Sequence, residues 1–150
     1  VNPDFPSLRT QVKKLLQEEQ ELSEIVQLVG KDSLAEPDKL TLEVARLVRE
    51  DFLQQNSYTP YDRVSPIWKT FWMLKNMLYF YDLGKRELTD AQQSEKRITY
   101  ESIASLMSKT IQKLVQMKFT DPADGEAECI RKFEEINNEI EEEFHRLNDS

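Results

Sequence analysis

The chain has 150 residues, of which 39% are hydrophobic and 32% are charged. This length and composition predict one globular domain with a sizeable core and argue against an intrinsically disordered chain. The net charge of −8 comes from residues 121–150, which hold 11 acidic and 3 basic side chains. The sequence therefore predicts no nucleic-acid surface.

The ends and the single cysteine place further limits on the class of protein. No stretch approaches the roughly 18 consecutive apolar residues of a membrane-spanning helix, so we expect no direct insertion into a membrane. Residues 1–5 lack the basic and apolar regions of a signal peptide and are typical of a junction inside a longer protein. Cys129 is the only cysteine, which excludes an intrachain disulfide, and we expect it to pack in the core.

The first helix is predicted over residues 5–29. Its aliphatic side chains recur at a rough helical spacing, and we expect them to face the core: Leu8, Val12, Leu15, Leu16, Leu22, Ile25, Val26 and Val29. Gly30 is well placed to end this helix, and residues 31–36 form a short linker. A second helix opens at 36–38, where a proline and two acidic groups suit a first turn, and ends near residue 55.

The second half of the chain predicts three more helices. Residues 66–86 follow a loop of turn-forming residues and are the most apolar stretch, so we expect this helix at the centre of a bundle. Residues 87–96 are polar and predict a connection. Helices follow over 98–118 and 123–147, the last with a glutamate-rich face that we expect solvent to cover. The pattern predicts an all-α bundle of about five helices in a single domain.

No pattern in the chain is typical of an active site. A P-loop requires G-x-x-x-x-G-K-[ST], and neither of the two Gly-Lys pairs, at positions 30 and 84, is followed by Ser or Thr. His145 is the only histidine, which argues against both a catalytic triad and a zinc site. Paired carboxylates lie opposite apolar helix faces, which favours a surface role over a hydrolytic one.

One loop, residues 52–63, carries side chains that suit a ligand. It holds two glutamines, an asparagine, two tyrosines and a proline. Such groups can pack flat against an aromatic heterocycle and hydrogen-bond its edge. Loops of this composition also occur in ordinary helix connections, so the composition alone leaves both interpretations open.

Two stretches resemble the C-terminal domain of the catalytic A subunit of eukaryotic vacuolar-type proton ATPases. One runs from Glu24 to Leu40, and the other from Asp51 to Arg63, with the string QQNSYTPYDR. The segment 117–127 also fits, so the resemblance spans nearly the whole chain. It implies a subunit that hydrolyses Mg-ATP to drive rotary proton transport, with the P-loop, catalytic glutamate and metal site upstream of this domain. The isolated chain is then expected to bind no cofactor and to be inactive.

The resemblance implies that the second stretch lines the adenine side of the nucleotide pocket. The residues concerned are Gln54, Gln55, Asn56, Ser57 and Tyr58. Tyr58 would stack on the base, and Gln55 and Asn56 would border its edge. No residue of the chain is implied to be catalytic or to bind metal.

The resemblance implies that the first stretch contacts the central stalk. The residues concerned are Lys31, Asp32, Ser33, Leu34, Ala35, Glu36, Pro37 and Asp38. They match the acidic helix-turn-helix loop of F-type β subunits, which pushes on the rotating stalk. Because this chain is less acidic there, we expect the contact to depend on shape more than on charge.

The implied partners are B subunits in an alternating hexameric ring and the central-stalk subunits. The implied location is the cytoplasmic side of vacuolar or endosomal membranes, in a peripheral complex. A different class of function stays open, in which a non-enzymatic helical adaptor binds a basic partner through its acidic last helix. An independent enzyme has little support from the residues.

Overall fold

The computed structural model describes residues 5–50, 67–94 and 97–149. Within these ranges the chain forms six α-helices and three short 3-10 helices, and no strands. In chain order they are α1 (Phe5–Val29), η1 (Lys31–Ser33), α2 (Glu36–Val48), α3 (Ile67–Ser94), α4 (Tyr100–Leu106), α5 (Ser108–Gln116), η5 (Met117–Phe119), η6 (Pro122–Asp124) and α6 (Glu126–Asp149). The predicted all-α fold is confirmed.

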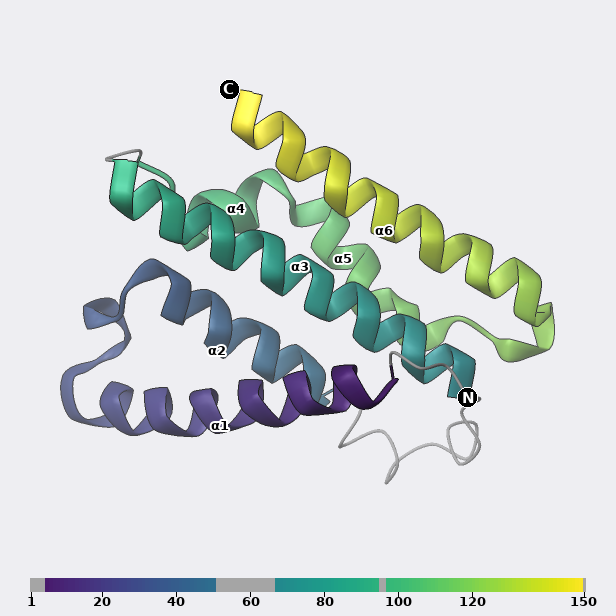
Figure 1. The fold of residues 1–150 in the computed structure, drawn as a ribbon, viewed down its shortest axis with the longest axis horizontal. Coiled ribbons are helices and arrows are strands. Elements are labelled where there is room, and N and C mark those ends of the chain that lie inside the picture. Colours follow the sequence, from purple (N-terminus) through teal and green to yellow (C-terminus); the bar gives the residue numbers. More distant parts are fainter. Residues whose placement is uncertain (1–4, 51–66, 95–96, 150) are drawn as a thin grey trace.

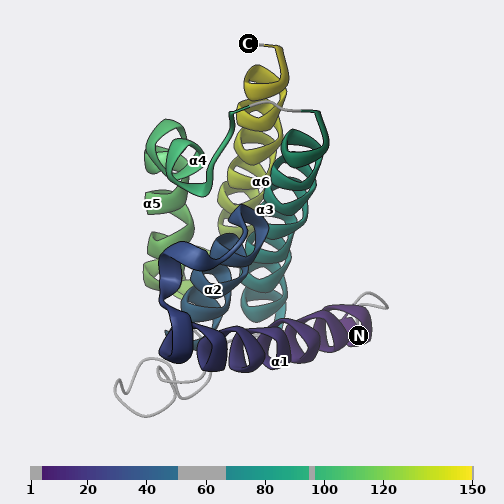
Figure 2. The same ribbon diagram turned by 90° about the vertical axis from the view of Figure 1, so that its left-hand side faces the viewer.

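Helix α3 lies at the centre of the arrangement (Figure 1). It packs against α2 on one side and α6 on the other, while α5 packs against α6 and α3. Helix α1 lies across α2 and α3 instead of running parallel to them, as Figure 2 shows at the foot of the bundle. The central position of α3 confirms what its all-round apolar character predicts.

The core consists of apolar side chains from α2, α3 and α6, with smaller contributions from α1, α4 and α5. Those that are almost fully removed from solvent include Leu40, Met77, Leu88, Phe133 and Ile140. Burying one such side chain contributes about 1.5–3 kcal/mol to stability. Cys129 is also buried in this core, as expected, and its burial raises the pKa of its thiol.

A buried amide fixes the register of α3 against α6. The Asn76 Nδ2 donates to the backbone oxygen of Phe133 at 3.0 Å, and its Oδ1 accepts from Asn137 Nδ2 at 3.1 Å. Asn76 is completely buried. Since an unpaired buried amide costs about 1–3 kcal/mol, only the pairing that satisfies these bonds is favourable.

The central helix is longer than its polar end suggests. Residues 87–96 were predicted to form a connection, and this prediction is wrong for residues 87–94, because α3 continues to Ser94. Leu88 and Ala91 continue the buried face of α3 one and two turns beyond Gly84. This stripe is too sparse to stand out among the polar residues around it, although it is sufficient to keep the helix packed.

The predicted helix over 98–118 is two helices. Thr99 caps α4 through a reciprocal pair of bonds with Ser102, at 3.1 and 2.8 Å. The backbone then leaves the helical region at Met107, with φ −106° and ψ 21°. Ile103 and Leu114 are both buried and stand eleven residues apart, about three helical turns. The apolar stripe therefore continues across the break at Met107. For this reason the periodicity of the sequence could not reveal that the helix is interrupted.

The ends of the other helices differ from the predictions by a few residues. Helix α2 ends at Val48, and a wider helical turn continues through residues 49–50; the rest of the stretch predicted to reach 55 lies outside the described residues. Residues 122–124 form η6, so α6 begins at Glu126 and not at 123.

The two ends of the bundle carry different parts of the chain. The start of α1, the end of α2 and the start of α3 lie at one end, near the label N in Figure 1. The end of α1, η1 and the start of α2 lie at the opposite end. Helix α2 alone, with 13 residues, separates these ends by about 20 Å.

The first testable prediction concerns the contact between α2 and α3 at Gly84. A Cβ atom there would lie 2.8 Å from Leu40 Cδ2 and 3.6 Å from Phe144 Cζ. Replacing an interior helical glycine by alanine ordinarily stabilises by about 1 kcal/mol. Because Leu40 is completely buried and has little room to move, we expect Gly84→Ala to lower the free energy of unfolding by about 1 kcal/mol instead.

Denaturant unfolding of this chain measures the effect, and a double-mutant cycle with Leu40→Ala isolates its cause. In the Leu40→Ala background the clash is removed, so Gly84→Ala should become neutral or stabilising. An equal cost in both backgrounds would contradict the assigned contact.

Candidate functional site

The residues predicted to line the adenine side of a nucleotide pocket, Gln54 to Tyr58, lie outside the described residues. They belong to the connection between α2 and α3. The structure therefore places the two helix ends that flank this connection, Val48 and Ile67, and both lie at the end of the bundle that holds the start of α1 (Figure 1).

The segment predicted to contact a stalk is a compact turn at the opposite end. Gly30 adopts φ +90°, a conformation that L side chains rarely adopt, and its amide donates to Val26 O at 2.8 Å to finish α1. Ser33 Oγ then donates to the Gly30 carbonyl at 2.7 Å, and the Leu34 amide donates to Lys31 O at 3.1 Å. These bonds give the turn a defined shape.

Only part of the segment 31–38 faces solvent. Leu34 and Pro37 are buried against the rest of the domain. Glu36 is half-buried, and its Oε2 lies 3.1 Å from Lys39 Nζ. The two groups form an ion pair whose geometry is not that of a hydrogen bond. Asp38 is also half-buried, so the exposed side chains of the segment are Lys31, Asp32, Ser33 and Ala35.

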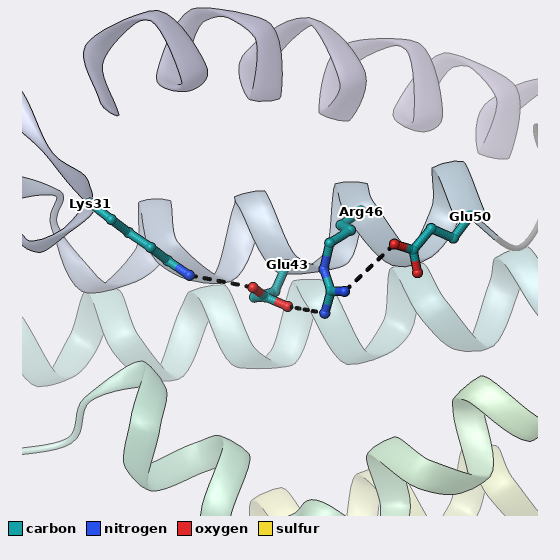
Figure 3. A network of polar contacts seen from close by, with 4 residues as sticks. All are labelled: Lys31, Glu43, Arg46 and Glu50. Carbon is teal, nitrogen blue, oxygen red and sulfur yellow. Dashed lines mark hydrogen bonds and ion pairs between the residues drawn. The ribbon is translucent and has the colours of Figure 1, made fainter. Parts of the chain in front are cut away.

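A row of ion pairs extends from this turn along α2 (Figure 3). Lys31 Nζ lies 3.5 Å from Glu43 Oε1, and Arg46 Nη2 donates to Glu43 Oε2 at 2.8 Å. Arg46 Nη1 lies 3.6 Å from Glu50 Oε1, next to the connection between α2 and α3. The hydrogen bond and charge of Glu43 raise the pKa of Arg46 above its usual range. Lys31 is therefore turned toward α2.

The last turn of α1 exposes aliphatic side chains that were predicted to face the core. Ile25 is 43% exposed, Leu28 is 84% exposed and Val29 is 64% exposed. The prediction was wrong for Ile25 and Val29 because no other described element covers the side of α1 on which they lie. Leu28 lay outside the predicted stripe, and its position beside Val29 at the helix end was the signal that could have identified this surface.

A polar hollow of about 290 Å³ lies between α1 and α3. Its lining includes Lys14, Glu18, Tyr81, Asp82 and Lys85. Tyr81 Oη lies 3.4 Å from Glu18 Oε2 and 3.0 Å from Thr41 Oγ1, so the same groups join α1, α2 and α3. Burial raises the pKa of Asp82. The two positive charges, of Lys14 and Lys85, balance the two negative charges, of Glu18 and Asp82. The hydrogen bonds of Tyr81 to Glu18 and Thr41 also hold the three helices together.

The acidic face of α6 is mostly solvated, as predicted, but several of its carboxylates already have partners. Arg131 pairs with Glu128 and Glu135, and Lys113 of α5 pairs with Glu139 at 2.7 Å. His145 is exposed near the helix end, as expected. These internal pairs reduce the charge that the helix could offer to a basic partner, which weakens the adaptor interpretation.

The described residues limit the class of site that this part of the chain can form. No group of three or more His, Cys, Asp or Glu side chains in these ranges could hold a metal ion. No helix there is both long enough and apolar enough to cross a membrane. The exposed parts of the described chain include the turn at residues 31–33 and the aliphatic side chains Ile25, Leu28 and Val29 at the end of α1.

Comparison with known proteins gives consistent matches. Residues 1–98 match the family described as the C-terminal domain of V and A type ATP synthase. The chain is 51% identical over 148 residues to isoform 2 of the V-type proton ATPase catalytic A subunit of Drosophila melanogaster, covering 98% of this chain and 24% of that protein. It is 52% identical over 148 residues to the V-type proton ATPase catalytic A subunit of Caenorhabditis elegans, with the same coverage of 98% and 24%.

A more distant relative agrees. The chain is 44% identical over 149 residues to the V-type proton ATPase catalytic A subunit of Dictyostelium discoideum, covering 99% of this chain and 24% of that protein. The chain thus spans about a quarter of the length of the curated relatives it matches. Since the family match covers well over half of its residues, the chain belongs to the family of the C-terminal domain of V and A type ATP synthases.

Proposed function

We propose that this chain is the helical C-terminal domain of a catalytic A subunit of a V-type proton ATPase, which hydrolyses ATP to drive rotary proton transport. The names of the relatives, at 44% to 52% identity, support this assignment. In this proposal the phosphate and metal sites lie in the remainder of the subunit, and the present domain is inactive by itself. Mg-ATP is then a ligand of the whole subunit.

Within that subunit, the domain closes the adenine side of the nucleotide pocket and transmits motion to the central stalk. The observation that carries this proposal is that the turn 31–38 lies at one end of α2, while the end of α2 from which the connection 51–66 continues lies at the opposite end of the bundle (Figure 1). The connection 51–66 follows α2, and the turn 31–38 precedes and begins it. A ligand that draws in one end of a rigid helical body moves the other end, as in hinge closure of domains.

The packing supports the rigidity that such a lever needs. Helix α2 packs against α3, with Leu40 next to Gly84, and its side chains Leu40, Val44 and Val48 are almost completely buried. Helix α1 is tied to the end of α2 by an ion pair between Glu19 and Arg49. The turn 31–38 cannot move independently of α2, because Leu34 and Pro37 anchor it.

The proposed assembly is an alternating hexameric ring with B subunits, around a central stalk. It would lie as a peripheral complex on the cytoplasmic side of vacuolar or endosomal membranes. The proposed stalk contact uses the exposed part of the turn, Lys31, Asp32, Ser33 and Ala35. Leu34, Glu36, Pro37 and Asp38 then support the shape of the turn.

A second prediction tests the adenine-side assignment in the full subunit. If Tyr58 stacks on the base, Tyr58→Ala should weaken ATP binding roughly 5- to 150-fold, because aromatic stacking on a base contributes about 1–3 kcal/mol. Nucleotide titration of the assembled complex measures the affinity. Tyr58→Phe keeps the ring and should bind nearly as well. Unchanged affinity and turnover in Tyr58→Ala would remove this residue from the pocket.

A third prediction tests the stalk contact. A photoreactive amino acid at position 33, in the exposed turn, should cross-link to a central-stalk subunit in the purified complex. The same group at position 131, on the exposed face of α6, serves as the control and should not capture the stalk. Capture of neighbouring ring subunits alone from position 33 would count against the lever.

A further inference from the structure

The short stretch that leads into α4 presents a hydroxyl group on an exposed, extended piece of chain (Figure 1). Residues 97–99 belong to no helix, and Thr99 adopts φ −115° and ψ 165°, in the extended region. The side chains of Arg97 and Thr99 are exposed, and Ile98 between them is half-buried. Because many recognition proteins take a peptide segment in extended form, this backbone already has a shape that a modifying enzyme can bind.

The sequence directly before Thr99 is basic. Lys96 and Arg97 occupy the third and second positions before this hydroxyl. Arg97 is exposed and forms no ion pair with another described residue. No other Ser or Thr of the chain has Lys or Arg at both of these positions. Protein kinases choose among hydroxyl groups partly by the charges of flanking residues, so this pattern sets Thr99 apart.

The fold separates Thr99 from two other hydroxyls that follow a basic residue. Thr41 comes two positions after a lysine, but it is buried, and its Oγ1 donates to Pro37 O at 3.1 Å. Thr89 comes three positions after Arg86, but it lies inside α3, where the backbone cannot extend without breaking the helix. Thr99 alone among these three combines a basic flank, exposure and an extended backbone.

The hydrogen bonds of Thr99 are local and can open with little loss of packing. Its Oγ1 accepts from the Ser102 amide at 3.1 Å, and its own amide donates to Ser102 Oγ at 2.8 Å. Helix α4 has seven residues, of which only Ile103 is buried. Segments with few buried side chains open at low free-energy cost, so Thr99 and its neighbours can enter an enzyme cleft while the bundle stays folded.

We propose that Thr99 is a phosphorylation site for a Ser/Thr protein kinase that selects basic residues before its acceptor. In the transfer, Thr99 Oγ forms a bond to the γ-phosphorus of Mg-ATP, the bond from that phosphorus to the β–γ bridging oxygen breaks, and ADP leaves. The hydroxyl proton passes to a carboxylate of the kinase. The product is a phosphothreonine with about 1.5 to 2 negative charges at pH 7. This inference goes beyond the proposed function and does not depend on it.

The phosphate would add charge near the row of ion pairs on α2. Helix α4 packs against α2. Burial raises the pKa of Tyr100 to about 12, and the negative charge of Glu43 contributes to the increase, so Tyr100 lies close to this row. A phosphate on the preceding residue adds negative charge to the same surroundings, where it repels Glu43 and attracts Arg46. The ion pairs of α2 would therefore respond to the modification.

The fourth prediction is tested on this chain, purified and incubated with Mg-ATP and the cAMP-dependent protein kinase, an enzyme that prefers basic residues before its acceptor. We expect mass spectrometry to find a phosphate on Thr99. Thr99→Asn removes the acceptor but keeps a residue that caps helices well, so this phosphate should be lost while the helix content stays unchanged. Thr99→Ser keeps both the hydroxyl and the cap, and it should be phosphorylated.

Arg97→Ala tests the basic flank. It should lower the kcat/KM of phosphorylation at Thr99 about tenfold or more, because a hydrogen bond to a charged group contributes that much to recognition. Arg86→Ala is the matched control, since Arg86 is an exposed arginine of α3 that lies outside the segment before Thr99. It should leave this kcat/KM unchanged.

Three results would overturn the inference. One is the absence of phosphate on Thr99 in the folded chain while a peptide of residues 94–105 is phosphorylated, since the fold would then withhold the site. The second is phosphate on other residues with Thr99 unmodified. The third is an equal kcat/KM in Arg97→Ala and the unsubstituted chain. None of these results bears on the proposed function, because the assay requires no assembled ATPase.

Discussion

The packing of α3 against α2 and α6 is the constraint on which the rest of the structure depends. On the α2 side, the absence of a side chain at Gly84 lets Leu40 approach closely. On the α6 side, Asn76 is satisfied only in one register, by Phe133 O and Asn137. The contact at Gly84 sets the distance between α2 and α3, and the hydrogen bonds of Asn76 prevent α3 from sliding along α6. The three helices therefore form a single body.

Helix α1 is attached to this body over only part of its length. Leu8 and Leu15 are buried, Glu19 pairs with Arg49, and the Tyr81 hydroxyl reaches Glu18 and Thr41. Beyond Glu19 the helix continues for ten residues without a buried side chain. The domain therefore presents a helix end that is packed at its base and exposes Ile25, Leu28 and Val29 along its last turns.

Periodicity in the sequence predicted most of the fold, and its errors have one physical origin. A repeat of three and four residues shows which side chains share a helix face, but not whether another element covers that face. Ile25 and Val29 share the face of a stripe and are exposed, whereas Leu88 and Ala91, in a polar stretch, are buried. The crossing of α1 and the length of α3 depend on tertiary packing, which the local pattern does not contain.

The candidate site was predictable to a different extent. The turn 31–38 could be located because Gly30 before it, together with its own proline and acidic residues, marks the end of one helix and the start of the next. Its resemblance to a known family implied a role. Which of its residues face solvent could not be predicted, because the burial of Leu34 and Pro37 depends on α2 and its neighbours. The 84% exposure of Leu28 likewise depends on which elements lie beside the end of α1, and the local pattern does not contain that information.

These features together define how force could pass through the domain. The row from Lys31 to Glu50 follows α2 from the turn to the connection 51–66, but its side chains are largely exposed, and such pairs contribute about 0–1 kcal/mol each. Stiffness must therefore come from the buried contacts of α2 and α3. The row instead directs Lys31 toward Glu43 of α2 and away from α1. Rigidity thus resides in the apolar core, and the exposed ion pairs along α2 contribute little to it.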